Sequence, residues 1–274
     1  MNRTEKTTLP TVAAVVITRD EERNIASCLE SVQWMDDIVV VDACSTDRTV
    51  EIAKRYTKKV MTRPWPGYGA QRNFSIAQAT TDWVFVIDAD ERVTPALRAE
   101  LQAVLQAGPP PDVSAYAVPR RNYFYGKWIR FGGIYPDYTP RLIRRTAGRY
   151  AEDVPLHEPL FLKGTSVRLR APLDHFSMPT IQGHVQKMMR YTSLGADDKL
   201  KRRAHISKLD IAGSHLVTAF KTYVLKQGWR DGVHGIVIAG FAGLHTFVKY
   251  AKSWERLCRN AALASREPSE AGPS

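Results

Sequence analysis

The sequence predicts an α/β fold: a mostly parallel, twisted sheet with helices on both faces, followed by a C-terminal helical region. Two observations predict this fold class. Continuous apolar runs of strand length alternate with segments whose apolar residues recur at helical spacing, the pattern of strands buried on both faces. Three of those runs end in acidic residues, at the edge where an open α/β sheet binds its ligand. With 274 residues, 44% of them hydrophobic, the chain can bury a full core.

The expected elements follow one another regularly. The apolar run at 12–17 is closed by a charged cluster at 19–22, so we expect a strand there and not a signal peptide. A helix should follow at 22–32, because Ile25, Leu29 and Val32 recur at helical spacing. The later expected elements are strands at 38–41, 60–61 and 83–87, a helix that ends near residue 56, and helices at 70–79 and 96–106.

The strand at 83–87 runs into Asp88-Ala89-Asp90. Residues i and i+2 of an extended chain point to the same side, so the two carboxylates can present oxygens to one hard cation or to a phosphate-bound metal. The alternative is ordinary turn chemistry, in which Asp90 or Thr94 caps the next helix and Pro95 occupies its first position. The surroundings decide between these interpretations.

Acidic residues follow two other strands as well, at 20–22 and at Asp42 with Asp47. The ends of parallel strands meet at one edge, so we expect these carboxylates to converge there. Hydrogen-bond donors of a nucleoside, together with a divalent metal on a diphosphate, would satisfy them. Neither a G-x-G-x-x-G fingerprint after the first strand nor a P-loop motif occurs, which argues against dinucleotide oxidoreductases and P-loop enzymes.

Four blocks of the chain resemble the inverting glycosyltransferases of family 2, which have the nucleotide-sugar-binding GT-A fold. The blocks are ITRDEERNI at 17–25, VVDACSTDRT at 40–49, QRN at 71–73 and DADE at 88–91. More narrowly, the chain is similar to the branch that adds a sugar to the inner core of bacterial lipopolysaccharide, and this resemblance extends past residue 250. Asp20 replaces the family's usual Asn and Cys44 its usual Gly, so the turn after the second strand is expected to differ in shape.

The resemblance implies a metal-dependent hexosyltransferase with UDP-glucose as the best guess for its donor. Glu21 and Asp42 would contact the nucleoside, and Arg72 the uracil or the diphosphate. The implied donor-binding residues are Thr18, Glu21, Asp42, Arg72 and Asp88. The implied ligands of a Mg²⁺ or Mn²⁺ ion are Asp90, Asp88 (which would otherwise bind the ribose) and His175, which as an isolated histidine is alternatively structural.

Direct inversion needs a general base, since the acceptor hydroxyl loses a proton as it attacks the anomeric carbon. One carboxylate suffices. Residues 153–158 resemble the family's acidic motif, which favours Glu158, with His157 as the residue that orients it; the alternative for Glu158 is a salt bridge, for instance with Arg141. The candidates in order of preference are Glu158, Asp153 and Asp137, and Glu152 is a further acidic residue of the same region.

The run Gly108-Pro109-Pro110-Pro111 marks a boundary between a donor half at 1–110 and an acceptor and catalytic half at 111–180. The acceptor half contains a run of aromatic and arginine side chains at 120–138. Aromatic faces stack on sugars and arginines bind phosphates, so this run suits a phosphorylated, lipid-linked saccharide. An aromatic core with exposed arginines explains it equally well. Nucleic acid is not expected, because no RNA-binding motif accompanies the aromatics.

The region 181–260 is basic and amphipathic, with fourteen Lys or Arg against five Asp or Glu, most of the chain's net charge of +11. Its most apolar stretch, 233–248, would reach about 24 Å as a helix, short of the ~30 Å hydrocarbon core. We therefore expect either an interfacial helix on an anionic membrane surface or a helical subdomain with a solvated basic face. Residues 261–274 are expected to be a disordered tail.

Together these features predict a cytoplasmic enzyme, peripheral on the inner face of the bacterial inner membrane. Three dispersed cysteines without a C-x-x-C pair fit a reducing compartment. Two alternatives stay open: a glycosyltransferase that uses a polyprenyl-phosphate or another polysaccharide acceptor, and a non-catalytic protein that binds nucleotide sugars or saccharides.

Overall fold

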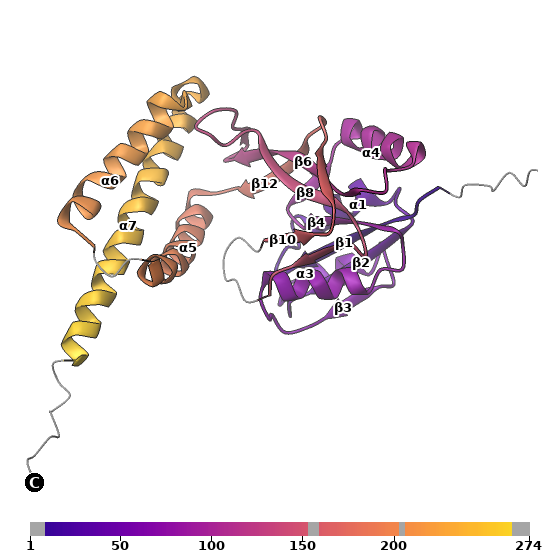
Figure 1. Cartoon of the computed structure of the whole chain (residues 1–274), viewed down its shortest axis with the longest axis horizontal. Coiled ribbons are helices and arrows are strands. Elements are labelled where there is room, and N and C mark those ends of the chain that lie inside the picture. The colour runs from indigo at the N-terminus through magenta and orange to yellow at the C-terminus, as the bar shows by residue number, and fades with distance from the viewer. Residues whose placement is uncertain (1–8, 153–158, 203–205, 265–274) are drawn as a thin grey trace, which may run out of the picture. The chain divides into compact units, whose positions relative to one another are not determined.

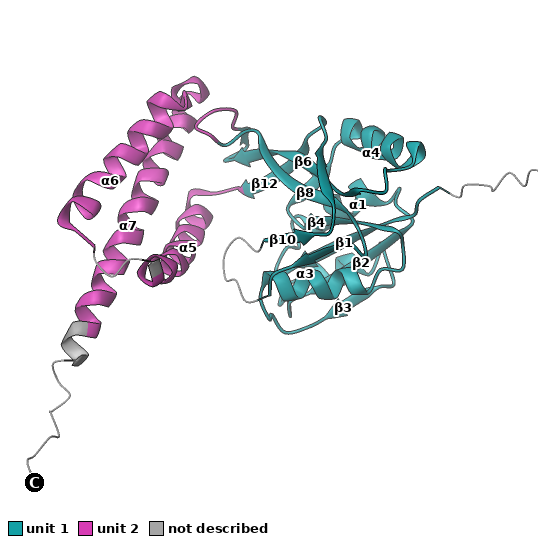
Figure 2. Cartoon of the chain, in the orientation of Figure 1, with its two compact units in different colours: residues 1–128, 134–177 teal, residues 129–133, 178–274 magenta. Residues whose placement is uncertain are grey.

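The computed structural model describes residues 9–152, 159–202 and 206–264. The chain forms two compact units, shown in order of sequence in Figure 1 and by colour in Figure 2. Unit 1 comprises residues 1–128 and 134–177, and unit 2 comprises 129–133 and 178–274. The expected donor half and most of the expected acceptor half therefore lie in unit 1, while 129–133 and 178–180 of the acceptor half belong to unit 2.

Unit 1 begins with four parallel strands, β1 (Val12–Thr18), β2 (Asp37–Asp42), β3 (Val60–Thr62) and β4 (Trp83–Asp88). Every residue of β1 is buried, which explains its continuous apolar sequence. Strand β1 lies between β2 and β4, with Ala14 paired to Ile38 on one side and to Phe85 on the other. The four strands occur where the sequence predicts them.

Helices cover both faces of these strands, as predicted. The apolar side chains of α1 (Ile25–Val32) and α4 (Pro95–Ala107) pack with Val12, Ala14 and Val16, together with Ala53 of α2 (Thr49–Ala53). Ile76 of α3 (Tyr68–Ala77) packs with Ala13 and Val15, on the opposite face. Helix α2 ends at Ala53, a turn earlier than the expected end near residue 56.

Strands of the middle segment extend this sheet, mostly by antiparallel pairing. Among the described residues the order is β3-β2-β1-β4-β8-β6-β12-β5, with β7 (Lys127–Trp128) and β11 (Thr165–Arg168) paired to β6. The strands added next to β4 are β8 (Asp137–Arg144), β6 (Val113–Phe124), β12 (Leu173–Met178) and β5 (Glu91–Val93). A separate pair consists of β9 (Gly148–Tyr150) and β10 (Leu160–Leu162). Strands of the acceptor half thus belong to the same sheet as the strands whose ends carry the acidic residues.

Thr94 caps α4: its side chain accepts a hydrogen bond from the backbone nitrogen of Leu97 at 3.1 Å, and Pro95 is the first helical residue. The capping interpretation is correct for Thr94. Asp90 does not cap this helix.

Unit 2 contains α5 (Ile181–Arg202), α6 (Lys208–Phe220), the short helices η1 (Lys221–Leu225) and η2 (Gly228–Asp231), and α7 (Val233–Ala264). Within the described residues, none of the helices has the length and apolar content needed to cross a membrane. Helix α7 continues through Ala264, so the expected tail is helical at its start, and 265–274 lie outside the described residues.

Candidate functional site

The carboxyl ends of β1, β2 and β4 bring the predicted donor residues to one edge of the sheet. Thr18 is paired with Asp42, and its neighbour Ile17 is paired with Asp88. Thr18 is almost fully buried, and its hydroxyl has no hydrogen-bond partner among the described residues. A buried polar group without a partner costs about 1–3 kcal/mol. The hydroxyl therefore suits a polar ligand or a water at this edge.

The turns after β1 and β2 hold each other. Asp20 Oδ1 accepts a hydrogen bond from the backbone nitrogen of Thr46 at 2.8 Å, and the backbone nitrogen of Asp20 donates to Ser45 Oγ at 2.8 Å. Asp20 and Cys44 both have positive φ, 52° and 57°. Asp tolerates this left-handed conformation, which otherwise favours glycine. Cys44 has a left-handed backbone conformation, which glycine, the family's usual residue at this position, adopts readily.

Asp42 and Glu21 are placed differently at this edge. Asp42 is fully buried, and its two oxygens accept hydrogen bonds from the backbone and the hydroxyl of Ser45, so it shapes the turn. Glu21 is only partly buried, and its Oε2 accepts a hydrogen bond from Asn24 Nδ2 at 2.7 Å. Of the two predicted nucleoside contacts, Glu21 is the more accessible.

Asp88 lies in a cluster of arginines at the end of β4. Arg72 Nη2 donates to both of its oxygens, at 3.0 and 3.3 Å, and Arg141 Nη2 donates to Oδ2 at 3.0 Å. Arg141 is only 1% exposed and also binds Glu91, which is 0% exposed. Burial alone would raise the pKa of Asp88, but the two arginines hold it well below the usual range. Asp88 is therefore ionised and fixed in place.

Asp90, in the turn between β4 and β5, faces His175 of β12. Pairing of β12 with β5 places His175 opposite Glu91, and His175 Nε2 lies 3.4 Å from Asp90 Oδ2. His175 Nδ1 is 2.6 Å from Asn122 Oδ1. The Asn122 amide is oriented by its nitrogen, which donates to Asp137 Oδ2 at 3.3 Å. The Asn122 oxygen favours a hydrogen on Nδ1 and fixes the orientation of the ring, with Nε2 toward Asp90.

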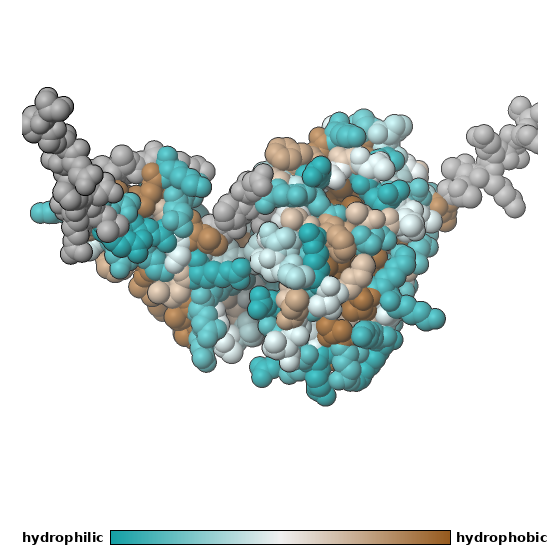
Figure 3. Space-filling view, turned by 90° about the horizontal axis from the view of Figure 1, so that it is seen from below, coloured by the Kyte–Doolittle hydropathy of each residue, from teal (hydrophilic) through white to brown (hydrophobic). Residues whose placement is uncertain are grey.

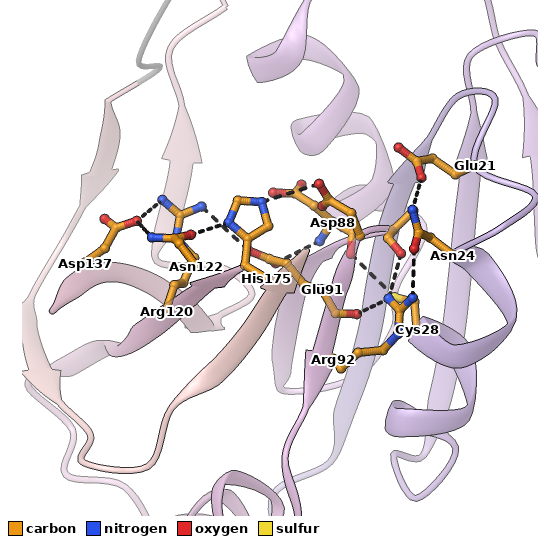
Figure 4. Close-up of polar contacts among 12 residues, drawn as sticks. Glu21, Asn24, Cys28, Asp88, Glu91, Arg92, Arg120, Asn122, Asp137 and His175 are labelled. Carbon is orange, nitrogen blue, oxygen red and sulfur yellow. Dashed lines mark hydrogen bonds and ion pairs between the residues drawn. The ribbon is translucent and has the colours of Figure 1, made fainter. Parts of the chain in front are cut away.

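Figure 4 shows these side chains as one chain of polar contacts from Glu21 to Asp137. Arg92 joins the Glu21 end to Glu91, because it donates to Asn24 Oδ1 at 3.1 Å and to the backbone oxygen of Glu91 at 2.8 Å. Arg120 binds Asp137 Oδ2 at 2.6 Å and lies 3.6 Å from Glu91 Oε1. Donor-side and acceptor-side residues thus belong to one network. Sequence reasoning gave no site role to Glu91 or Arg141, and it placed Arg120 and Asn122 only in the run at 120–138 expected to bind the acceptor.

The predicted bases are only partly visible. Asp153, His157 and Glu158 lie outside the described residues. Asp137 is described and is held by Arg120 and Asn122. Glu152, the residue before Asp153, accepts a hydrogen bond from Asn73 Nδ2 at 2.8 Å, which lowers its pKa.

The aromatic and arginine run of 120–138 is partly internal. Arg121 forms a two-point ion pair with Asp174, with distances of 2.5 and 2.9 Å, and Arg120 is bound as described above. Tyr123 stacks on Phe176 with ring centroids 4.9 Å apart. These two arginines are bound to carboxylates of the chain, whereas the structural interpretation of this run expected exposed arginines.

Comparison with known proteins identifies the family. The family model described as "Glycosyl transferase family 2" matches residues 13–159, more than half of the chain. This chain belongs to glycosyltransferase family 2. Within the family, a relative over nearly its whole length is the lipopolysaccharide core biosynthesis glycosyltransferase LpsC of Rhizobium meliloti (strain 1021), 30% identical over 253 residues, 89% of this chain and 92% of the relative. The predicted GT-A fold and glycosyltransferase activity are confirmed.

Solved structures with detectable similarity include other sugar transferases. Mannosyl-3-phosphoglycerate synthase from Rubrobacter xylanophilus is 17% identical, with a TM-score of 0.47 and coverage of 74% of this chain and 78% of that one. Glucosyl-3-phosphoglycerate synthase from Mycobacterium tuberculosis, in complex with Mn²⁺, UDP-glucose and phosphoglyceric acid, is 23% identical, with a TM-score of 0.35 and coverage of 41% and 44%.

Proposed function

We propose that this family 2 enzyme transfers a hexose, with inversion, from a nucleotide sugar to a phosphorylated, lipid-linked saccharide of a bacterial lipopolysaccharide inner core. UDP-glucose is the preferred donor. The observation that carries the proposal is the similarity to LpsC over most of both chains. Membership of a transferase family favours catalysis over the non-catalytic alternative. The basic region at 181–260 supports work at the anionic inner face of the inner membrane.

The donor site has two side chains suited to a divalent cation. Asp90 Oδ2 and His175 Nε2 are 3.4 Å apart, close to the roughly 3 Å between neighbouring oxygens around an octahedral Mg²⁺ with ~2.1 Å bonds. Among the described residues, no group of three or more His, Cys, Asp or Glu is arranged as a metal site. That agrees with an ion held by one or two protein ligands and the diphosphate. Asp88, which is bound by Arg72 and Arg141, would instead hold the ribose side.

Such an ion, when bound, would offset the charge that develops on the departing diphosphate. The side chains of this enzyme supply the rest. Glu21 is placed to accept hydrogen bonds from the nucleoside. A carboxylate of the acceptor half, with Glu158 preferred, takes the proton of the acceptor hydroxyl as the new glycosidic bond forms and the bond to the diphosphate breaks.

Replacing Asn122 with alanine is expected to raise the Mn²⁺ concentration for half-maximal transfer about 10–100-fold, since His175 loses the partner that fixes its ring. The measurement is initial rate against Mn²⁺ concentration. Asn73→Ala is the matched control, because Asn73 also bonds through both amide atoms, but to the backbone of Tyr150 and to Glu152. An unchanged metal requirement in Asn122→Ala would mean that Asn122 does not position a metal ligand.

Glu158→Gln is expected to lower turnover about 10²-fold while donor binding is retained, because glutamine keeps the shape but cannot accept the proton. Asp153→Asn and Asp137→Asn should each lose less. Turnover and UDP affinity are measured for all three. Near-normal turnover of Glu158→Gln, together with loss of turnover in Asp153→Asn, would transfer the role of base to Asp153.

The overall proposal is tested with the purified enzyme, a panel of nucleotide sugars, Mg²⁺ or Mn²⁺, and truncated lipopolysaccharide cores, by the mass added to the acceptor. A hexose added to a core from UDP-glucose is expected. Transfer to a polyprenyl phosphate, with none to any core, would establish the alternative acceptor.

A further inference from the structure

Helix α7 of unit 2 packs with two different helices on two of its faces. On the first face Gly243 meets α6, and a Cβ added to it would lie 2.9 Å from the carbonyl oxygen of His215. On the second face Phe241 meets α5, stacked on His184 with ring centroids 3.9 Å apart. At roughly 100° per residue, Phe241 and Gly243 point about 160° apart. A third side of α7 keeps exposed apolar side chains, although Phe247 on it also packs edge-on against His215 of α6, with ring centroids 5.5 Å apart.

That third side is apolar. Its exposed side chains are Val233, Ile236, Leu244, Phe247 and Trp254. Successive members are three, eight, three and seven residues apart. Each of these steps is close to a whole number of turns of a helix with 3.6 residues per turn, so the side chains lie on one stripe. Helix α6 has a matching stripe, with Leu209, Leu216 and Phe220 exposed at i, i+7 and i+11.

The two stripes point to the same side. Leu216 follows His215 by one residue and Leu244 follows Gly243 by one residue, so each lies about 100° beyond the contact between the helices. A two-fold axis perpendicular to the plane of the two helices exchanges one antiparallel helix with the other. Side chains that lie the same number of residues after the contact point therefore face the same side of the pair. We call this surface the hairpin face: Leu209, Leu216, Phe220, Val233, Ile236, Leu244, Phe247 and Trp254.

Charged side chains flank the hairpin face but are absent from the first sixteen residues of α7. Residues 233–248 contain no Asp, Glu, Lys or Arg. Exposed cations stand at the ends of α6, with Lys208 at its start and Lys221, Lys226 and Arg230 at the turn that leads to α7. Brown, apolar surface is visible in Figure 3 along the lower edge of the helical unit, among teal hydrophilic groups.

We propose that the hairpin face lies flat on an anionic lipid bilayer, with its apolar side chains among the acyl chains and the flanking cations at the headgroups. This inference rests on the membrane association in the proposed function and assigns it a surface. An in-plane position agrees with the absence of a membrane-crossing helix among the described residues. A second copy of the chain fits less well, since residues 181–260 carry a net charge of +9 in each copy and would repel. Exposed Trp229 and Trp254 suit the interface between headgroups and acyl chains.

The test is flotation of the full chain with vesicles of phosphatidylcholine alone or with 30 mol% of an anionic phospholipid, without any saccharide. The variant Leu216→Glu/Leu244→Glu places two acidic groups in the hairpin face, at positions 63% and 44% exposed. Its matched control is Phe161→Glu/Val167→Glu in unit 1, at positions 63% and 41% exposed. We expect salt-sensitive binding of the wild type and the control to anionic vesicles, and at least tenfold weaker binding of the hairpin-face variant.

Equal binding by the two double variants, or no binding by the wild type, would overturn the proposal. So would a lipid-free dimer that Leu216→Glu/Leu244→Glu converts to a monomer, because the face would then be an interface between copies. Since the vesicles hold no acceptor, these outcomes are independent of which sugar is transferred. Transfer to a water-soluble core fragment by the hairpin-face variant shows that its fold and donor site are intact.

Discussion

Arg141→Met is expected to lower the free energy of unfolding by about 3–5 kcal/mol, because it leaves buried carboxylates without their partner. Arg141 is 1% exposed and binds both Asp88 and Glu91 through Nη2. Without it, Glu91, which is 0% exposed, keeps Arg120 at 3.6 Å as its nearest cation and a hydrogen bond from the backbone nitrogen of Asp88 at 3.0 Å. Asp88 keeps Arg72 at 3.0 Å, so the larger part of the loss comes from Glu91.

Urea unfolding at neutral pH measures this loss. Arg144→Met is the matched control on the same strand: Arg144 donates to backbone oxygens of Val113 and Pro110 and is not fully buried, so its loss should cost about 1 kcal/mol. Adding Glu91→Gln to Arg141→Met should restore part of the stability, since the uncompensated charge is removed. A loss below 1 kcal/mol in Arg141→Met would show that water or rearrangement satisfies the carboxylates.

The pH dependence gives a second measurement on the same cluster. The folded-state pKa of Asp88 lies below its unfolded value, because its arginine partners outweigh the effect of burial. The resulting stabilisation is complete above the unfolded pKa of about 3.9 and is lost as the pH falls below it. In Arg141→Met this acid-sensitive part of the stability should be smaller.

The fold of the donor half was predictable because its signals are local. Each parallel strand is a continuous apolar run, and α4 is delimited by Thr94 and Pro95 at its start and Gly108 just after its end. The same local signals placed Asp88 and Asp90 at the ligand edge. Helix α2 was overestimated because its polar final turn has no strong stop signal.

The arginine cluster was not predictable, since it depends on pairing between distant strands. Phe85 of β4 pairs with Leu142 of β8, and this register brings Arg141 beside Asp88. Nothing near Arg141 in the sequence specifies that register. The role of Asn122 has the same origin, because β6 and β12 are neighbours in the sheet although about fifty residues separate Asn122 from His175. The one available signal was the place of Arg141 directly before the apolar pair Leu142-Ile143, and Arg141 was interpreted only as a partner for Glu158.

Asp90→Ala is expected to reduce metal-dependent transfer about 10³-fold, which corresponds to roughly 4 kcal/mol of lost stabilisation of the transition state. Asp90 is the acid of the D-x-D pair that faces His175, whereas Asp88 is bound by arginines. The folded enzyme should be little affected, because Asp90 is partly exposed and does not cap α4.

Two measurements separate loss of a metal ligand from damage to the fold. The first is UDP binding by calorimetry with and without Mn²⁺: the metal should tighten binding to the wild type and to Asp112→Ala, an exposed aspartate that accepts only from Thr165, but not to Asp90→Ala. The second is the double variant Asp90→Ala/His175→Ala, which should lose little beyond Asp90→Ala, since two ligands of one ion act as a unit and their losses are not additive. Metal-dependent transfer within a few-fold of wild type in Asp90→Ala would exclude Asp90 as the ligand and leave its contact with His175 as a structural one.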